Sequence, residues 1–436
     1  MYLAQRRSTG ALTASAECRM IISCKGFGTP FTPNNLPDLA CRAIPNQRLV
    51  HSFGINNAFT TTDKERSREF KNEAIHKLNL TDDKWLYLAK EAQTIIKGSL
   101  NQCAVSDTEI PLMPYIQNLT LRIVLSIMFD VDAMALCSAA IDIVTASIND
   151  LWKKSKLVST PTSADAFAMQ HHFRSALHDL LPGHDHDDPT SNPLNLILPA
   201  YETLWRIVLS GFVEIRFRNR YGDTRSACIT ALGAFLASPS GPDNSSNRST
   251  RKDTETDGTP NITAFDIARE LLRLYPSTKR VYRVFDSTPG LTSPVTVAAN
   301  VEAIHRCTSI WGASAGLFDP SRWITSPSQS NSQPRQSNTA VSVVDMKEKE
   351  KEKERRNAYM PFGVHPFLCP ARKDFGRRII ALLVASLVVG VSEEEEEGDD
   401  EWRLEVPELW REVVRKGEAP LPSERDSFEG WALVRG

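Results

Sequence analysis

Apolar residues recur at intervals of three and four along several long segments, which is the spacing of one face of an α-helix. We expect helices of this kind at residues 117–129, 194–217, 264–275 and 375–391. Alternating patterns typical of strands are few and short, at residues 280–285 and 294–298. Neither βαβ alternation nor an internal repeat is visible. The pattern therefore predicts a helix-rich α+β fold, mainly α with a small β component.

Three polar segments interrupt this pattern, near residues 237–262, 326–356 and 393–401. The first two begin with Ser, Asn, Thr and Gly and have almost nothing to bury, so they are expected to be solvated inserts. The second ends in the alternating-charge tract 347–356, for which a frayed helix stays an alternative, and the third is an acidic run. Residues 1–50 are expected to form an irregular N-terminal segment, and residues 51–436 one domain that carries the inserts.

The charge balance and the cysteines exclude several classes of protein. The 436 residues contain 51 Lys and Arg and 53 Asp and Glu, so the net charge of -2 argues against nucleic acid as the main partner. The 8 cysteines show no spacing of a zinc site or a disulfide framework, which favours a reducing compartment. The longest apolar run, residues 379–391, has the length of a buried core helix, so no transmembrane helix is expected.

Three segments carry candidate chemistry. Glu270 and Arg273 stand at i and i+3 among leucines and are expected to form a buried ion pair, although an ordinary surface pair is the alternative. Arg322 follows in the cluster 317–323, where a solvated loop arginine is the plain alternative. Cys369 ends a proline-rich aromatic loop just before a helix, and such a position favours a thiolate. A buried, inert cysteine is the other interpretation.

Taken in this order, the three segments resemble the cytochrome P-450 family of haem-thiolate monooxygenases. The sequence ELLR at 270–273 is similar to that family's E-x-x-R helix, and PSRW at 320–323 is similar to its P-x-R-x motif. Phe362-Gly363 followed by CPA at 369–371 resembles its haem-binding loop, and ILPAYET at 197–203 the acid–alcohol signature of the helix that crosses the haem. The resemblance extends from about residue 50 to 392 and implies a cytochrome P-450-like fold.

The resemblance also implies a role for individual residues, with iron protoporphyrin IX (haem) as the cofactor. Cys369 would be the axial thiolate on the iron and the metal ligand. Phe362 would pack near the sulfur and Arg280 would contact a haem propionate. The distal pair would position water and deliver protons, and a structural triad would hold the proximal loop. The pair is Glu202 and Thr203, and the triad is Glu270, Arg273 and Arg322.

The chain departs from the family pattern at several positions. His365 stands where the loop usually has a glycine, and Phe367 replaces the usual basic residue two positions before the cysteine. The loss of that cation leaves more of the propionate contact to Arg280, with Arg66 or Arg68 as a weaker second candidate. Ala200, preceded by Pro199, takes a glycine position in the distal helix. Residues 1–50 lack the anchor, first helix and first strands of full-length relatives, as expected of a truncated or mis-spliced chain.

The function implied is insertion of one atom of dioxygen into a small apolar substrate, with a secondary metabolite as one candidate. A flavoprotein reductase would be the electron donor and would dock on the basic residues that follow Cys369, namely Arg372, Lys373, Arg377 and Arg378. Membrane association stays open without an anchor, in the cytoplasm or on the cytoplasmic face of the endoplasmic reticulum. The alternative is a non-catalytic, truncated family member with weak or no haem binding.

Overall fold

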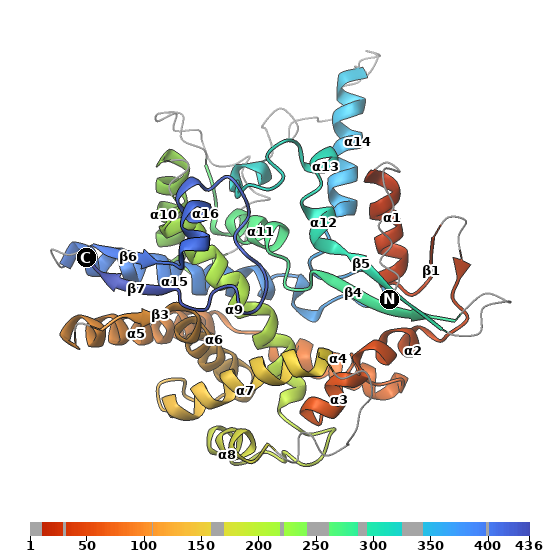
Figure 1. Cartoon of the computed structure of the whole chain (residues 1–436), viewed down its shortest axis with the longest axis horizontal. Coiled ribbons are helices and arrows are strands. Elements are labelled where there is room, and N and C mark those ends of the chain that lie inside the picture. Colours follow the sequence, from red (N-terminus) through yellow and green to blue (C-terminus); the bar gives the residue numbers. More distant parts are fainter. Residues whose placement is uncertain are drawn as a thin grey trace.

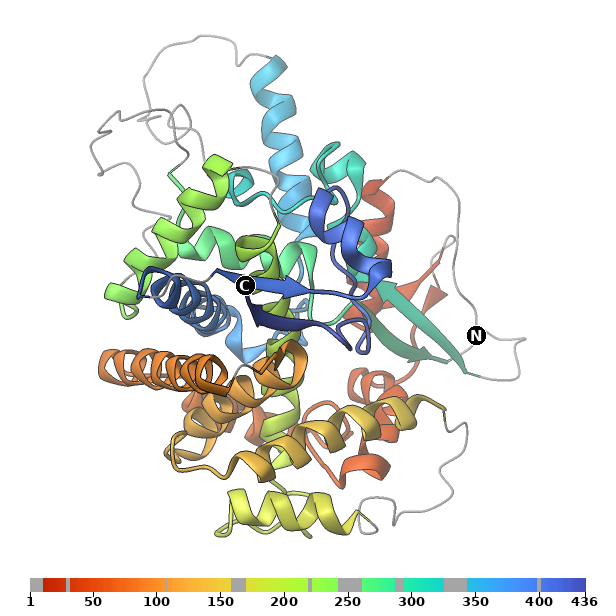
Figure 2. The same ribbon diagram turned by 60° about the vertical axis from the view of Figure 1, so that its left-hand side comes forward.

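The computed structural model describes residues 11–28, 32–106, 108–157, 170–218, 222–241, 261–286, 294–324, 343–397 and 401–436. Helices dominate, and one of them, α9 (Leu194–Arg216), runs through the middle of the molecule (Figures 1 and 2). In both views α8 lies at one end and α14 projects from the other. The remaining helices are α1 (Ala11–Ile22), α2 (Asp38–Ala43), α3 (Gln47–Phe53), α4 (Lys64–Lys77), α5 (Asp82–Ser106), α6 (Leu112–Phe129), α7 (Ser138–Leu157), α8 (His171–Leu180), α10 (Gly222–Ala237), α11 (Ala264–Leu274), α12 (Val301–His305), α13 (Thr308–Trp311), α14 (Val343–Ala358), α15 (Phe375–Glu397) and α16 (Glu408–Lys416).

In the described part of the chain the strands form three small antiparallel sheets. The hairpin of β4 (Arg280–Phe285) and β5 (Val295–Asn300) pairs Arg280 with Asn300 and Phe285 with Val295. A three-stranded sheet has the order β3-β7-β6, and a third sheet pairs two strands near the N-terminus. Their bounds are β1 (Gly26–Phe27), β2 (Thr32–Pro33), β3 (Ile110–Pro111), β6 (Trp402–Glu405) and β7 (Ala432–Arg435). The helix-rich fold and both predicted strands are confirmed, with β5 shifted by one residue at its start and two at its end.

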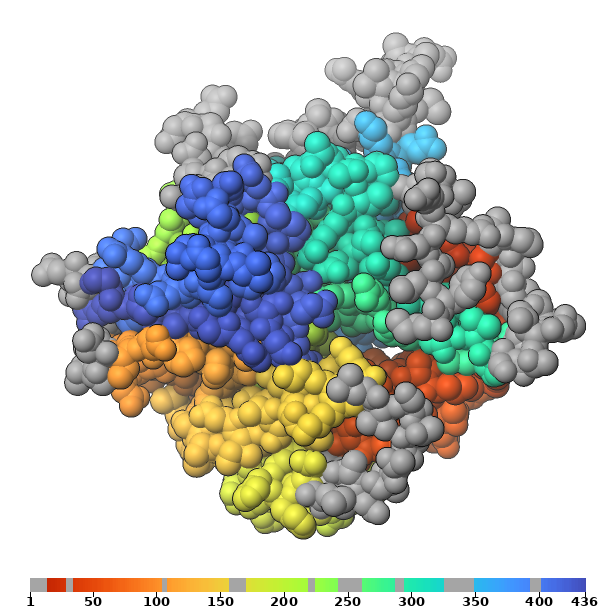
Figure 3. All heavy atoms as spheres, in the orientation of Figure 1, coloured from red at the N-terminus to blue at the C-terminus, as the bar shows by residue number. Residues whose placement is uncertain are grey.

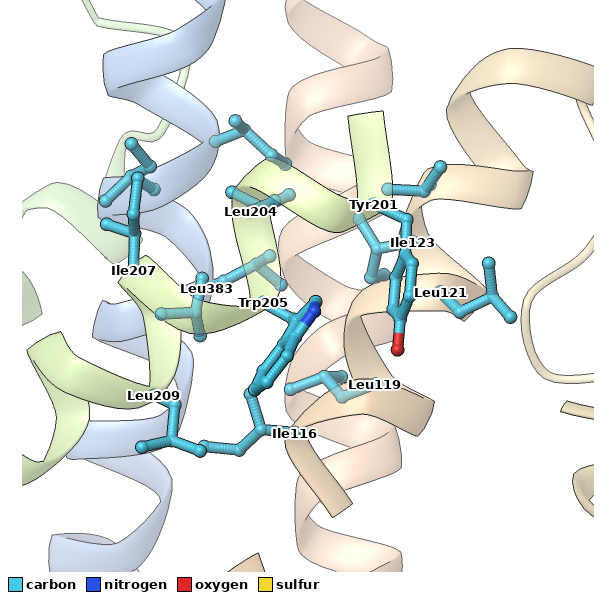
Figure 4. Close-up of a cluster of buried hydrophobic side chains, with 14 of the residues drawn as sticks. Ile116, Leu119, Leu121, Ile123, Tyr201, Leu204, Trp205, Ile207, Leu209 and Leu383 are labelled. Atoms are coloured by element: carbon cyan, nitrogen blue, oxygen red, sulfur yellow. The ribbon is translucent and has the colours of Figure 1, made fainter. Parts of the chain in front are cut away.

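The largest hydrophobic core forms where α9 meets α6, α11 and α15, with α5 packed against α6 and α15. Figure 4 shows Tyr201 and Trp205 of α9 pointing toward Ile116, Leu119 and other side chains of α6. Gly211 permits the close approach of three helices, because a Cβ there would lie 2.6 Å from Leu271 of α11 and 2.9 Å from Val384 of α15. This packing fixes α9 relative to the elements that carry the candidate site.

The apolar side chains of the long helices are mostly buried within the protein. Among the described residues three helices, α6, α9 and α15, are long and apolar enough to cross a membrane by length and composition, although the sequence predicted no transmembrane helix. The apolar windows of these helices are 72%, 78% and 72% buried within the protein. The sequence missed the length of α15 because it continues through the acidic run to Glu397.

The N-terminal region is more regular than the sequence suggested. The part expected to be irregular contains α1, β1, β2, α2 and much of α3. Cys18, Ile21 and Ile22 of α1 are buried in a second hydrophobic cluster together with Phe285 and Val297 of the β4–β5 hairpin. The sequence did not reveal this order because the short apolar patch at residues 20–22 is buried against the β4–β5 hairpin, which lies far away in the sequence.

The three expected inserts have different outcomes. Residues 242–260 and 325–342, which make up most of the first insert and the first half of the second, lie outside the described residues, as do 398–400. The charged tract 347–356 belongs to helix α14, and the side chains of residues 349–353 are exposed. Residues 393–397 complete α15. Helix formation in both tracts is the expected behaviour of Glu- and Lys-rich sequence attached to an existing helix.

Candidate functional site

The ion pair predicted between Glu270 and Arg273 is formed in the interior of the protein. Both side chains are fully buried on α11, and two hydrogen bonds of 2.9 and 2.7 Å join Nε and an Nη of Arg273 to the two carboxylate oxygens. Arg273 also donates to the carbonyl oxygens of three other residues, His305, Ala315 and Leu317, at 2.6–3.0 Å. All five N–H donors of the guanidinium are therefore satisfied.

The third member of the predicted triad joins the same carboxylate. Arg322, in the 3₁₀ turn Pro320–Trp323, donates from Nε to Glu270 at 3.3 Å. The indole N–H of Trp323 and the backbone N–H of Asp319 also donate to Glu270, each at 3.0 Å. A single buried carboxylate thus organises α11 and the loop 315–323, as the motif predicted.

His305 connects this network to the cysteine loop, although no motif in the sequence indicated a role for it. Its Nδ1 lies 3.1 Å from the carbonyl oxygen of Arg273, and its Nε2 accepts the backbone N–H of Met360 at 3.0 Å. Burial, with a further contribution from Arg273, lowers the pKa of His305 to about 3, so the ring is neutral. The only sequence signal was its place in the stretch that follows β5.

The loop before α15 presents Cys369. The backbone N–H of Cys369 donates to the carbonyl oxygen of Phe362 at 3.0 Å, and Pro370 begins the 3₁₀ turn Pro370–Arg372 directly after it. Gly363 takes the left-handed conformation, with φ of +73°, and a Cβ there would lie 2.9 Å from the carbonyl oxygen of Phe367. The turn expected to need a glycine at 365 therefore uses Gly363, and His365 is exposed.

The surroundings of the Cys369 thiol act on its ionisation in opposite directions. Burial raises its pKa, while the backbone N–H of Ala371 and the charge of Arg372 act in the opposite direction and are weaker. Burial thus opposes the thiolate that a helix N-terminus would favour. A metal ion that replaces the proton on sulfur would remove this conflict.

Phe362 belongs to the same loop as Cys369. Its ring packs partly buried against the main core and next to the first turn of α15. Gly376 makes room for it, because a Cβ there would lie 2.7 Å from the Phe362 ring and 2.9 Å from the carbonyl oxygen of Ala371. A missing side chain in α15 thus allows the ring to approach the backbone around Cys369.

The arginine that the sequence assigned to the cofactor is not the one that the structure brings to the loop. Arg280 is exposed at the start of β4, whereas Arg283 of the same strand is buried, with its guanidinium carbon 5.3 Å from the centroid of the Phe367 ring. The two arginines are separated by an odd number of positions, so a strand presents them on opposite faces. The register of β4 was the missing information.

A second buried guanidinium stacks on the same ring. Arg42, from α2, lies with its Cζ 4.4 Å from the Phe367 centroid. Within the described residues neither Arg42 nor Arg283 forms an ion pair with a carboxylate, and Nε of Arg42 is buried without a hydrogen-bond partner. Burial and the charge of Arg283 lower the pKa of Arg42 to about 10. Two uncompensated buried cations thus stack on the residue that lies two positions before Cys369 in the chain.

The other candidate arginines have separate partners. Arg66 donates to the backbone carbonyls of Asn56 and Thr190, and exposed Arg68 pairs with Glu65. Of the basic residues after Cys369, Arg372 and Lys373 are exposed, but Arg378 is buried and pairs with Asp374 at 2.6 Å. Arg378 is therefore not part of an exposed basic surface, contrary to expectation.

Glu202 and Thr203 lie on α9, next to Pro199. The hydroxyl of Thr203 donates to the carbonyl oxygen of Pro199 at 2.8 Å, one helical turn earlier. Both carboxylate oxygens of buried Glu202 are bound by Arg425 from the C-terminal segment, one of them at 3.0 Å. Arg425, which no sequence pattern indicated, also donates to Asn149 of α7.

Comparison with known proteins supports the fold. No family model matches the chain, and no curated sequence matches it. Among solved structures, a six-coordinated cytochrome P450 from Thermus thermophilus is similar at a TM-score of 0.51, with 14% identity over 92% of this chain and 88% of that one. Cytochrome P450 CYP102L1 is similar at 0.48, with 17% identity over 89% and 83%.

The first of these structures defines the class of fold. The chain has the helix-rich fold of the cytochromes P450, as its sequence motifs predicted. At this level of identity the likeness concerns the fold alone, and the chemistry must be argued from the residues around Cys369.

The first prediction concerns the buried carboxylate. Glu270→Gln should lower the free energy of unfolding by about 3–5 kcal/mol, because it leaves two buried guanidinium groups without their counter-charge. Urea unfolding followed by far-UV circular dichroism measures this change. Glu412→Gln, which removes an exposed pair with the same i,i+3 spacing, should leave the midpoint unchanged. Equal midpoints for the two variants would contradict the central position of Glu270.

The second prediction concerns His305. Its folded-state pKa of about 3 lies below the ordinary value of 6.5, so the unfolded chain binds a proton that the folded one excludes. The resulting stability is present above pH 6.5 and is lost as the pH falls toward 3, at up to about 1.4 kcal/mol per pH unit. Urea unfolding between pH 7.5 and 5.0 should show this slope in the wild type and a shallower one in His305→Leu. Parallel slopes would show that His305 is not buried and neutral.

Proposed function

We propose that the protein is a haem-thiolate monooxygenase that inserts one atom of dioxygen into a small apolar substrate. One observation carries the proposal. The buried cations Arg42 and Arg283 have no carboxylate partner among the described residues and stack on Phe367, which lies two positions before the partly buried Cys369. Burying two like charges is costly unless anions accompany them.

Haem supplies the groups that this arrangement lacks. Its two propionates are the counter-charges that Arg42 and Arg283 would bind, and its iron would replace the proton on Cys369. Phe362 would pack against the cofactor near the sulfur, at the end of the loop that the Glu270 network supports. When bound there, haem supplies the redox chemistry of dioxygen activation.

The side chains of α9 would handle protons on the opposite side of the cofactor. The hydroxyl of Thr203 can donate to a water molecule only by leaving the carbonyl oxygen of Pro199. The carboxylate of Glu202 is held by Arg425, which orients it and keeps it in a polar environment. We assign these two residues the delivery of protons from solvent to the reacting oxygen.

The electron donor would be a flavoprotein reductase that approaches the cysteine loop. Exposed Arg372 and Lys373 follow Cys369 closely in the chain and would attract an acidic surface. Arg378 does not contribute to this surface, since its side chain is buried against Asp374 and Pro239.

The third prediction tests the axial ligand. With haem supplied during expression, the reduced carbon monoxide complex should show the red-shifted band of a thiolate ligand, and Cys369→Ser should abolish it. Helical content by circular dichroism should be retained. Cys307→Ser is the matched control, because Cys307 is also partly buried and also directly precedes a helix. A band that survives in Cys369→Ser would show that another residue binds the iron. An apoprotein in the wild type would favour a non-catalytic chain.

The fourth prediction separates the two arginines of β4. Arg283→Gln should accelerate haem transfer to excess apomyoglobin about tenfold, since one charge-assisted contact contributes roughly 1.5–3 kcal/mol. Arg280→Gln should leave the transfer rate unchanged, because that side chain lies on the other face of the strand. Faster haem transfer from Arg280→Gln than from Arg283→Gln would instead support Arg280 as the propionate contact, as the sequence suggested.

A further inference from the structure

Two cysteines from different elements meet beside the buried Arg283. Cys24 follows α1 and Cys41 lies within α2, and both side chains are buried in the second hydrophobic cluster. The thiol of Cys41 donates a hydrogen bond to the sulfur of Cys24, and the guanidinium of Arg283 donates to the same sulfur. Two thiols and one cation therefore form a single cluster.

The backbone holds Cys24 in an unusual conformation. The N–H groups of Cys24 and Lys25 donate to carbonyl oxygens three and five residues earlier, each at 3.0 Å, which is the hydrogen-bond pattern that ends many helices. The left-handed position in this pattern usually belongs to glycine, but here it is Cys24, with φ of 61°. A side chain in this conformation costs roughly 1 kcal/mol. Strained positions of this kind are frequent at functional sites, which directs attention to the thiol.

The two sulfur atoms differ in their tendency to ionise. The hydrogen bond from Cys41 and the charge of Arg283 lower the pKa of Cys24, against the effect of its burial. The hydrogen bond to Cys24 and burial both raise the pKa of Cys41. Cys24 is thus the nucleophile of the pair, and Cys41 is a thiol within its reach.

Cys228 shows what burial does where the neighbouring charge is negative. Its side chain is 1% exposed, close to the 2% of Cys24. Burial, with a further contribution from Asp319, raises the pKa of Cys228 to about 12. A buried thiol of this kind is inert. The reactivity of Cys24 therefore comes from its two partners and not from its place in the core.

The pair lies close to the surface although it is buried. Lys25 directly follows Cys24 and is exposed, and Pro37 and Asp38 are exposed at the start of α2. Figure 3 shows the red surface of the N-terminal elements next to the teal surface of the β4–β5 hairpin, against which α1 and α2 pack. A water-sized hydroperoxide is the class of oxidant that suits a thiolate under so thin a cover.

We propose that Cys24 and Cys41 are a redox-active pair, which a hydroperoxide converts into a disulfide and a thiol reductant restores. With hydrogen peroxide, the Cys24 thiolate attacks one oxygen, the O–O bond breaks, and a sulfenic acid and hydroxide form. The sulfur of Cys41 then attacks the sulfur of Cys24, and the hydroxyl group leaves with the Cys41 proton as water. Two thiols lose two electrons, and one peroxide molecule is reduced to two water molecules. Two molecules of a thiol such as glutathione reverse the bond and become one disulfide.

The disulfide changes the charge beside the candidate cofactor site. In the reduced pair, the single negative charge of Cys24 faces Arg283 and also acts on Arg42, and it cannot balance both. Oxidation removes this charge and leaves both guanidinium groups to an incoming anion. Only this consequence rests on the proposed function, in which that anion is a propionate of haem.

Peptide mapping of the full chain detects the bond. After treatment with hydrogen peroxide, free thiols are blocked with N-ethylmaleimide in denaturant before digestion with trypsin. Cleavage after Arg19, Lys25 and Arg42 gives the peptides 20–25 and 26–42, each with one cysteine. These two peptides should appear linked, lighter by two hydrogen atoms than their sum, and dithiothreitol should separate them. Peptides that stay unlinked at a peroxide concentration that oxidises Cys228 would overturn the proposal.

Variants assign the role of each residue. Cys41→Ser should abolish the link and leave a sulfenic acid on Cys24 that dimedone labels, whereas Cys24→Ser should abolish the link and leave Cys41 unlabelled. Cys228→Ser is the matched control and should form the link at the wild-type rate. Arg283→Gln should slow the link several-fold, and Arg280→Gln should not, because only Arg283 contacts the sulfur. A folded Cys41→Ser without label on Cys24 would contradict the assignment of the nucleophile.

Haem retention tests the consequence for the cofactor site. Diamide, which oxidises thiols to disulfides, should slow haem transfer from the wild-type protein to apomyoglobin several-fold. The rate for Cys41→Ser should not change. Equal rates for the wild type before and after oxidation would show that the pair does not act on the cofactor site.

The mapping also distinguishes this proposal from the proposed function. Cys369→Ser should lose haem and still form the link, because the peroxide reacts at Cys24 itself. A wild-type protein that binds no haem and still forms the link would refute the monooxygenase and leave the thiol pair standing. A haem-loaded protein without the link would refute the thiol pair alone.

Discussion

The structure around the candidate site depends on one buried carboxylate. Glu270 accepts hydrogen bonds from Arg273, Arg322, Trp323 and the backbone of Asp319, all within 3.3 Å. Charges of this kind are tolerated in a protein interior only when their hydrogen bonds are complete, and here all donors of Arg273 are used. The network is therefore a rigid support rather than a source of net stability. Through His305 it fixes the backbone of Met360, where the cysteine loop begins.

The cysteine loop shows the opposite electrostatic condition. Two arginines, Arg273 and Arg322, pair with the single carboxylate of Glu270. In contrast, Arg42 and Arg283 have no carboxylate partner among the described residues. Burial also disfavours ionisation of Cys369. A cofactor that carries two carboxylates and a metal ion would provide counter-charges for both arginines and a partner for the sulfur of Cys369. The proposed function therefore rests on these two arginines and Cys369 more than on the distant likeness of the fold.

The sequence predicted the parts of the site that are local in the chain. The pair at 270 and 273 follows from helical spacing, and the Cys369 loop from its prolines and its place before an apolar helix. The sequence could not show that Arg283 rather than Arg280 lies beside Phe367, because the face of a strand depends on its register, which short strands define poorly. Arg42, Arg425 and His305 act across 32 or more residues of sequence, and no periodic pattern reports such contacts. The folded N-terminal region was missed for the same reason, since α1 packs against β4, β5, α12 and α14, which come far later in the chain.

The bond between iron and the sulfur of Cys369 is the central claim. X-ray absorption at the iron edge of the haem-loaded wild-type protein measures that bond directly, because sulfur and lighter atoms scatter differently in the first coordination sphere. The account predicts one sulfur neighbour in addition to the four pyrrole nitrogens. A first sphere that contains only nitrogen and oxygen would contradict it.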